Sequence, residues 1–189
     1  MRIIVGATGR VTRVRFLAML RFAAVALLLV GCRISLSSEN NDPVVDTDGG
    51  AADPRGCQVS TTLPSCTGAV GHSDLAWIEA NVFKDGCNFS GCHNGAAGNS
   101  STVDLTPGRS YAHLVGFTSH IDSSRKMVVA NNLAASYLLL MLGDIAPASA
   151  SPPASGLPAA GRMPQGAPQL CCQKLDAIER WITAGAPSM

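Results

Sequence analysis

The chain has 189 residues, a net charge of +1 and an apolar content of 47 %, but only 5 % of its residues are aromatic. A near-neutral charge without a basic patch argues against nucleic acid as a partner, and the length suffices for one compact domain. Seven cysteines in so small a chain are typical of an oxidising compartment or of a covalently attached cofactor, and such covalent help suits a core with few aromatic side chains.

The first 31 residues have the pattern of an export signal. Four arginines between positions 10 and 21 precede the uninterrupted apolar run Phe22–Val30. This run is too short to span a bilayer, which takes about 20 residues, but it matches the apolar region of a signal peptide. We therefore predict a signal peptide over residues 1–31, for which Met19 would be a more regular start.

The end of this segment, Leu29–Cys32, resembles the lipobox of bacterial lipoproteins. In that family the cysteine is lipidated and becomes the first residue of the mature chain. The resemblance implies lipidation at Cys32 and attachment to a membrane through that lipid. Because Arg33 rather than an aspartate follows, it also implies an exported outer-membrane lipoprotein that faces the periplasm or the cell surface. An ordinary signal peptide that ends near a cysteine is the alternative.

Residues 32–72 are predicted to form a disordered, lipidated tether. The small and polar residues over 33–56 bury too little surface to offset the entropy of ordering them. Cys57 and Cys66 flank a Ser/Thr/Pro-rich segment at the end of this tether. We expect a local disulfide between them that closes a small surface loop.

The rest of the chain, residues 73–189, is predicted to form an all-α domain of three to five helices. The first helix carries Leu75, Ile78 and Val82 on one face. A long Pro/Gly/Ala-rich loop over 145–170 precedes the last helix. Helices are expected over residues 73–86, 110–115, 133–142 and 173–184.

Cys87, Cys92 and His93 form the predicted site. In haem c attachment, two thiols add to the two vinyl groups of the porphyrin, and the histidine directly after the second cysteine ligates the iron. The strong form of this motif has two residues between the cysteines; four stand there in this chain, so two extra residues must loop out. The pattern predicts haem c held by thioethers at Cys87 and Cys92, with His93 as the proximal ligand.

Further short motifs follow the predicted site in a fixed order. They are Val82-Phe83, Cys92–Gly95, Val103–Thr106, Tyr111–Val115, Val128–Asn132, Ala135–Leu139, Gly161–Pro164 and Trp181–Pro187. Together they resemble the small single-haem cytochrome c domains of bacterial lipoproteins, of the kind found in myxobacteria and planctomycetes. The resemblance implies that Met163 is the distal iron ligand, with His113 as the second candidate. It also implies an electron carrier for an unknown redox partner protein rather than an enzyme, since a His/Met-ligated iron has no open position.

A haem-less domain with the same fold is the main alternative. It would be a structural or interaction module at the surface or in the periplasm, stapled by three disulfides. Those disulfides would join Cys57 with Cys66, and Cys87 and Cys92 with Cys171 and Cys172 in either order.

A structural zinc site is a third arrangement that the ligand types allow. It would use Cys87, Cys92 and His93 with one of Cys171 and Cys172.

Overall fold

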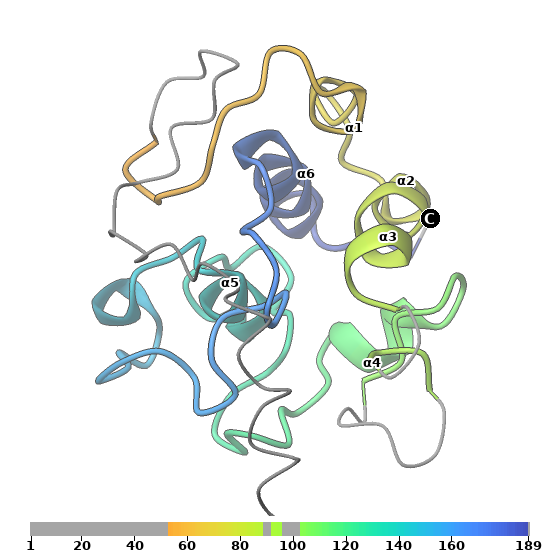
Figure 1. Cartoon of the computed structure of the whole chain (residues 1–189). Helices are drawn as coiled ribbons and strands as arrows, with labels where there is room; N and C mark the ends of the chain where they lie inside the picture. Colours follow the sequence, from red (N-terminus) through yellow and green to blue (C-terminus); the bar gives the residue numbers. More distant parts are fainter. Residues whose placement is uncertain (1–52, 89–91, 96–102, 189) are drawn as a thin grey trace, which may run out of the picture. The chain divides into compact units, whose positions relative to one another are not determined.

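The computed structural model describes residues 53–88, 92–95 and 103–188, and its helices are shown in Figure 1. The predicted signal peptide, Cys32 and the tether as far as residue 52 lie outside the described residues. Within the described part the regular elements are all helical, and extended pairing is limited to isolated bridges. The predicted all-helical class is confirmed at this level. None of the described helices combines the length and the apolar character needed to cross a bilayer.

The first predicted helix is present as one helical run of three parts. It consists of α2 (Leu75–Ile78), the π-helical turn η1 (Glu79–Phe83) and α3 (Lys84–Gly86). Asp74 caps it, because its carboxylate accepts a hydrogen bond from the backbone N–H of Trp77 at 2.8 Å. Single π-turns inside helices shift the register of the side chains that follow.

The buried glutamate of this run, Glu79, holds the next helix, α4 (Ser110–Leu114). Its carboxylate accepts hydrogen bonds from the hydroxyl of Ser110 and, at 2.9 Å, from the backbone N–H of Gly108. The position of α4 agrees with the predicted range, and Glu79 supplies the long-range contact that orders so short a helix.

The third helix, α5 (Tyr137–Leu142), is buried on every side, as its all-round apolar sequence predicts. It begins four residues later than expected. The hydroxyl of Ser136 donates to the carbonyl of Asn132 at 2.7 Å and accepts from the N–H of Val129 at 3.0 Å. These side-chain bonds compete with the helical pattern and delay the helix start.

The last helix, α6 (Cys172–Thr183), packs against α2 and against α1 (Pro64–Thr67) (Figure 1). Its apolar face fills the core with Leu175, Ile178, Trp181 and Ile182, each 0 % exposed. The run agrees with the predicted last helix within one residue at each end.

Two disulfides correct the predicted organisation of residues 53–72. Cys57 is bonded to Cys172 and Cys66 to Cys171, so the expected local bond between Cys57 and Cys66 is wrong. The segment is ordered against α6, where the guanidinium of Arg180 donates to two of its carbonyl groups. The composition of this segment predicts too little burial to offset the entropy of ordering it. The two cross-links, together with its contacts to α6, supply the missing stabilisation. The folded unit therefore includes residue 53 onward and does not begin at residue 73.

The long loop over 145–170 is fixed at several points. It contains the 3₁₀ turn η2 (Pro147–Ser149). The backbone N–H of Ser151 donates to the carbonyl of Ala134 at 2.7 Å, and that of Met163 to the carbonyl of Met141 at 2.7 Å. The loop thereby runs back along α5 before it reaches α6.

Candidate functional site

A mostly apolar cavity lies at the end of the first helical run and contains all four predicted haem-binding residues. It opens to solvent, and the space not filled by atoms amounts to about 850 Å³ when its mouth is included. Cys87, Cys92, His93 and Met163 all line it. Its apolar wall comprises Val82, Phe83, Val103, Leu105, Leu114, Met127, Leu138, Met141, Leu142 and Leu170.

The first thiol is placed by the end of the helical run. The backbone N–H of Cys87 donates to the carbonyl of Phe83 at 2.8 Å, which fixes Cys87 directly after α3. Burial, with a smaller contribution from the neighbouring Cys92, raises the pKa of the Cys87 thiol to about 11. Cys87 is therefore a protonated thiol at neutral pH.

The loop from Cys87 to His93 closes on itself. The backbone N–H of His93 donates to the carbonyl of Cys87 at 3.0 Å, and residues 89–91 between them lie outside the described part of the chain. Cys87, Cys92 and His93 still reach the same cavity. The two extra residues of the motif are thus compatible with a shared site for both thiols and the imidazole.

The imidazole of His93 has a defined tautomer. Its Nδ1 lies 3.3 Å from the carbonyl oxygen of Val103, and because a carbonyl only accepts, Nδ1 must carry the hydrogen. Burial lowers the pKa of His93, which favours the neutral ring. A neutral ring protonated at Nδ1 has its lone pair on Nε2, the arrangement that a metal-binding histidine needs.

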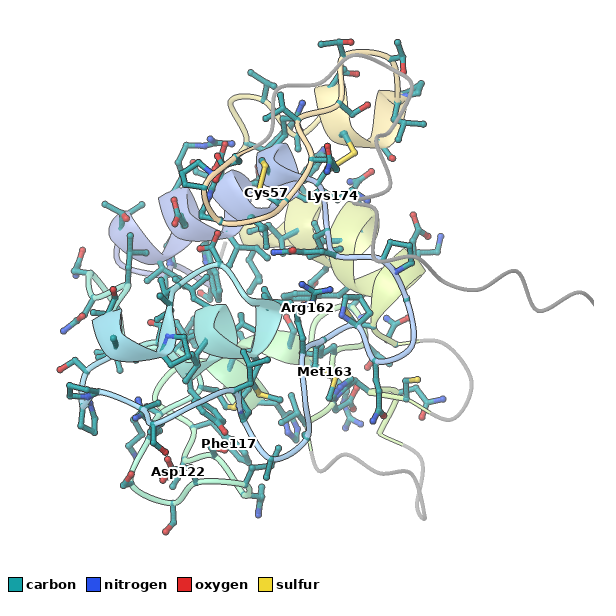
Figure 2. The ribbon with its side chains drawn as sticks, turned by 60° about the vertical axis from the view of Figure 1, so that its left-hand side comes forward. Cys57, Phe117, Asp122, Arg162, Met163 and Lys174 are labelled. Carbon is teal, nitrogen blue, oxygen red and sulfur yellow. A yellow bond between two sulfur atoms is a disulfide. The ribbon has the colours of Figure 1, made fainter. Side chains whose placement is uncertain are left out.

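Met163 reaches the cavity from the loop before α6, 70 positions after His93 (Figure 2). Two further methionines line the same cavity, Met127 and Met141. Their thioethers are potential ligands of the same type as that of Met163. No sequence motif identifies either of them, and Met141 in addition lies inside the apolar run of α5. His113, the second candidate for distal ligand, is not among the lining residues.

Cys87 and Cys92 carry no disulfide, whereas Cys171 and Cys172 are both bonded elsewhere. The disulfides expected for a haem-less domain, between Cys87 and Cys92 on one side and Cys171 and Cys172 on the other, are therefore wrong. The zinc arrangement fails for the same reason, because a disulfide sulfur is no thiolate ligand. The physical cause is the start of α6 at Cys172, where the adjacent cysteines meet the segment that carries Cys57 and Cys66.

A lysine stands near the first thiol. Lys174 of α6 is only 9 % exposed, and burial lowers its pKa, while the negative charge of Asp85 acts in the opposite direction. The charge of Lys174 acts on Cys87 in the direction that lowers the pKa of the thiol, against the effect of burial. Lys174 does not line the cavity, whose wall, among the described residues, contains no Asp, Glu, Lys or Arg, and such a wall suits a large apolar ligand.

Comparisons with protein-family models, with curated proteins and with solved structures found no match to this chain. The site is therefore interpreted from its own chemistry. Two thiols outside disulfides, an imidazole with a defined tautomer and thioether side chains around an apolar cavity are donors that fit haem c.

Proposed function

We propose that this protein is a haem c-binding electron carrier of the small cytochrome c type. The observation that carries the proposal is the convergence of Cys87, Cys92, His93 and Met163 on one apolar cavity. The two disulfides strengthen it, because they bond every other described cysteine and leave these two thiols available. The sequence resemblance to single-haem cytochrome c domains supports the same function.

Each residue has a distinct role in this proposal. The thiols of Cys87 and Cys92 would hold the porphyrin through thioethers, each formed by addition of S–H across a vinyl double bond, so that no oxidant is needed. His93 and Met163 would be the iron ligands. When bound, haem c would supply a one-electron iron couple, and a thioether ligand would favour the reduced iron.

The protein around these residues orients ligands and excludes water. The carbonyl of Val103 holds the imidazole of His93 by its Nδ1–H, so that Nε2 is the ligand atom. The side-chain amide of Asn88 donates to the carbonyl of Leu105 at 3.1 Å. This bond joins the end of the first helical run to the segment that carries Leu105, a lining residue of the cavity. If both His93 and Met163 ligated the iron, no position would remain for a substrate, and the chain would act as a carrier and not as an enzyme.

We further propose that the carrier is exported and anchored to the outer membrane through a lipid on Cys32, and that it exchanges electrons with a redox partner protein. Disulfides in the folded unit support export, because such bonds persist in oxidising compartments.

The alternative is a haem-less module of the same fold. Two disulfides bridge 115 and 105 residues of the chain and stabilise the fold without a cofactor. The four-residue spacing of the cysteines also favours it. In this form Cys87 and Cys92 would stay as thiols in an apolar cavity.

One experiment separates the two functions. The full precursor is expressed with its export signal, together with a cytochrome c maturation system, and the purified protein is examined by pyridine haemochrome spectrum and by intact mass. We expect one covalent haem on a chain that has lost four hydrogens to two disulfides. A chain without haem in which Cys87 and Cys92 are alkylated by iodoacetamide would support the haem-less module. A Cys87→Ala/Cys92→Ala variant is the matched control for covalent attachment.

A further inference from the structure

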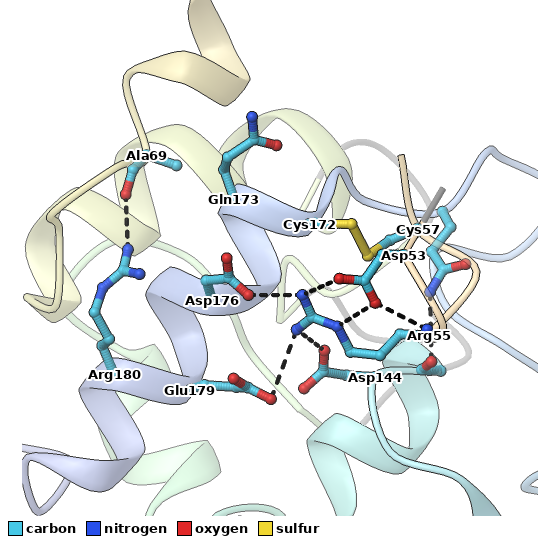
Figure 3. Close-up of polar contacts among 12 residues, drawn as sticks. Asp53, Arg55, Cys57, Ala69, Asp144, Cys172, Gln173, Asp176, Glu179 and Arg180 are labelled. Carbon is cyan, nitrogen blue, oxygen red and sulfur yellow. Dashed lines mark hydrogen bonds and ion pairs between the residues drawn. A yellow bond between two sulfur atoms is a disulfide. The ribbon is translucent and has the colours of Figure 1, made fainter. Parts of the chain in front are cut away.

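A single guanidinium lies at the centre of four carboxylates, away from the residues of the cavity. Arg55 bonds the carboxylates of Asp53, Asp144 and Asp176 at 2.9, 2.9 and 2.8 Å, and the carboxylate of Glu179 lies 3.7 Å from its Nη1 (Figure 3). These residues come from three parts of the fold: the stapled segment before Cys57, the end of α5, and α6. The cluster therefore joins elements that are distant in sequence.

The cluster has an excess of negative charge. Four ionised carboxylates and one guanidinium would carry a net charge of −3, and the negative groups are not equally solvated. The side chain of Asp144 has no exposed surface, whereas those of Asp53, Asp176 and Glu179 are 21, 38 and 29 % exposed. Because burial disfavours the charged form, Asp144 is the carboxylate of this cluster that is protonated most readily.

The hydrogen-bond partners of Asp144 also identify it as the carboxyl that takes up a proton. Its Oδ1 accepts from Arg55, but its Oδ2 has no donor within the described part of the chain. A buried carboxylate oxygen without a donor is unfavourable. If Oδ2 carries a proton, it becomes a donor. The carboxyl of Glu179 is a candidate acceptor, because Nη1 of Arg55 contacts both side chains, Oδ1 of Asp144 at 2.9 Å and Oε1 of Glu179 at 3.7 Å.

We propose that Asp144 and Glu179 form a binding site for one proton, held on Oδ2 of Asp144 and shared with Glu179, which fastens the disulfide-linked N-terminal segment to α5 and α6. With the proton bound, Oδ1 of Asp144 keeps its bond to Arg55 and Oδ2 gains one to Glu179. Without it, two like-charged carboxylates share the same guanidinium nitrogen, and the one on Asp144 has no exposed surface. Burial first, and then the hydrogen bond and charge of Glu179, raise the pKa of Asp144 to about 7, while Arg55 opposes the shift.

Other charged groups near the pair are engaged elsewhere. The aliphatic part of Arg162 approaches Gly143, next to Asp144, but its Nη1 donates to Gln169 at 3.1 Å. On α6, Arg180 donates to the carbonyls of Ala69 and His72. Neither guanidinium therefore replaces the missing donor.

Proton binding at this pair makes the fold sensitive to pH in a defined direction. The pKa of Asp144 lies above its ordinary value of 3.8, so the folded chain binds more protons than the unfolded chain between about pH 4 and pH 7. The stabilisation is complete in acid and is lost as the pH rises through about 7. Since Asp144 is the second residue after α5 and Arg55 lies two residues before Cys57, the loss acts on the junction between α5, α6 and the stapled segment.

The test compares Asp144→Asn with wild type in the mature protein with both disulfides formed. The asparagine amide can donate to Glu179 while its oxygen accepts from Arg55, so the variant imitates the protonated pair. We expect the melting temperature of wild type to fall by several degrees between about pH 5 and pH 8.5, and that of the variant to fall much less. Asp176→Asn removes a carboxylate from the same guanidinium at a more exposed position, and should keep the wild-type slope.

Infrared spectroscopy tests the site by a readout other than stability, with Asp144→Asn as the control. A protonated carboxylic-acid band that disappears with a midpoint near pH 7 supports the proposal if Asp144→Asn lacks it. Absence of such a band above about pH 5, the upper end of ordinary aspartate titration, overturns the proposal. So does a band, or a wild-type pH slope of stability, that persists in Asp144→Asn.

Discussion

The backbone N–H of Met163 donates a hydrogen bond to the backbone carbonyl of Met141 across 2.7 Å, and the side chains of both residues line the same cavity. The bond fixes the loop before α6 to the helix α5. Because it uses backbone atoms only, substitution of either side chain leaves it in place. The two methionines can therefore be compared directly as candidate iron ligands.

Met163→Leu tests the distal ligand in the haem-loaded protein. We expect haem to stay covalently attached, because the thioethers and His93 are unchanged, while the reduction potential falls. Axial ligands move haem potentials over about 0.8 V in total, so loss of a thioether should be easily measured by redox titration. The charge-transfer absorption of thioether-ligated ferric iron should disappear as well.

Met141→Leu is the matched control for that experiment. It replaces a methionine of the same cavity wall, 5 % exposed, by an apolar side chain of similar volume. The potential and the absorption band should stay close to those of wild type. If instead the band is lost in Met141→Leu and kept in Met163→Leu, the assignment of the distal ligand moves to Met141.

His93→Ala should prevent accumulation of stable haem-loaded protein. The substitution removes the imidazole whose Nδ1 is held by Val103, and with it the proximal ligand beside the second thioether. Haem content per chain, measured by pyridine haemochrome, is the readout. His113→Ala serves as the control and should keep wild-type haem content, since His113 does not line the cavity. Equal haem content in the two variants would contradict the role of His93.

The stabilisation from the two disulfides should not be additive: whichever bond is removed first should cost less than the one removed second. Either bond alone closes a loop of more than 100 residues, and a loop of that length is worth about 4.7 kcal/mol. Once one is closed, the second adds only a short loop through Cys57, Cys66 and the adjacent cysteines, worth roughly 3 kcal/mol. We therefore expect Cys66→Ser/Cys171→Ser to lower the free energy of unfolding by about 3 kcal/mol, and removal of all four cysteines to lower it by about 7 to 8 kcal/mol.

Urea denaturation of the haem-free protein measures these losses. A different double variant, Cys57→Ser/Cys66→Ser, leaves Cys171 and Cys172 as free thiols at the start of α6, directly after Leu170, which lines the same cavity as Cys87. It should therefore incorporate less haem than Cys66→Ser/Cys171→Ser, because Cys87 can be consumed in wrong disulfides. Equal haem incorporation would mean that the native disulfides do not protect the site thiols.

The reactivity of Cys87 should follow its raised pKa. With a thiol pKa of about 11, the thiolate that reacts with iodoacetamide is scarce at about pH 8. We expect alkylation of Cys87 in the folded, haem-free chain to be roughly 100-fold slower at that pH than in the urea-denatured chain, where the pKa returns to about 8.5. The rate should rise about tenfold per pH unit up to about pH 11, as followed by peptide mass spectrometry. A rate that levels off near pH 9 in the folded chain would contradict burial of this thiol.

The helices were predictable because their signals are local. The apolar positions of the run from Leu75 to Val82 recur with helical spacing, and the continuous apolar stretch of α5 requires burial on all sides. The start of α5 was not predictable at the same level. Ser136 redirects its hydrogen bonds to residues 129 and 132 only after the preceding segment has folded back on it.

The candidate site was predictable as a set of residues but not as a cavity. Cys87, Cys92 and His93 are singled out by their spacing, and Met163 by its resemblance to a family motif. Met127 and Met141 carry no such signal, and their presence in the same wall depends on how the loop and α5 pack. The partner of His93, the carbonyl of Val103, is a backbone group and has no sequence signature at all.

The sequence by itself determined the helical class and the approximate helix ranges, because these follow from periodicity, and its short motifs named the residues of the candidate site. Only the tertiary structure decided the cysteine pairing and the extent of the folded unit. Cys57 and Cys66 lie nine positions apart, but each bonds a cysteine more than 100 residues away. Disulfide partners are chosen by the positions of sulfur atoms in the folded chain, where the start of α6 meets the N-terminal segment, and chain distance does not encode that meeting.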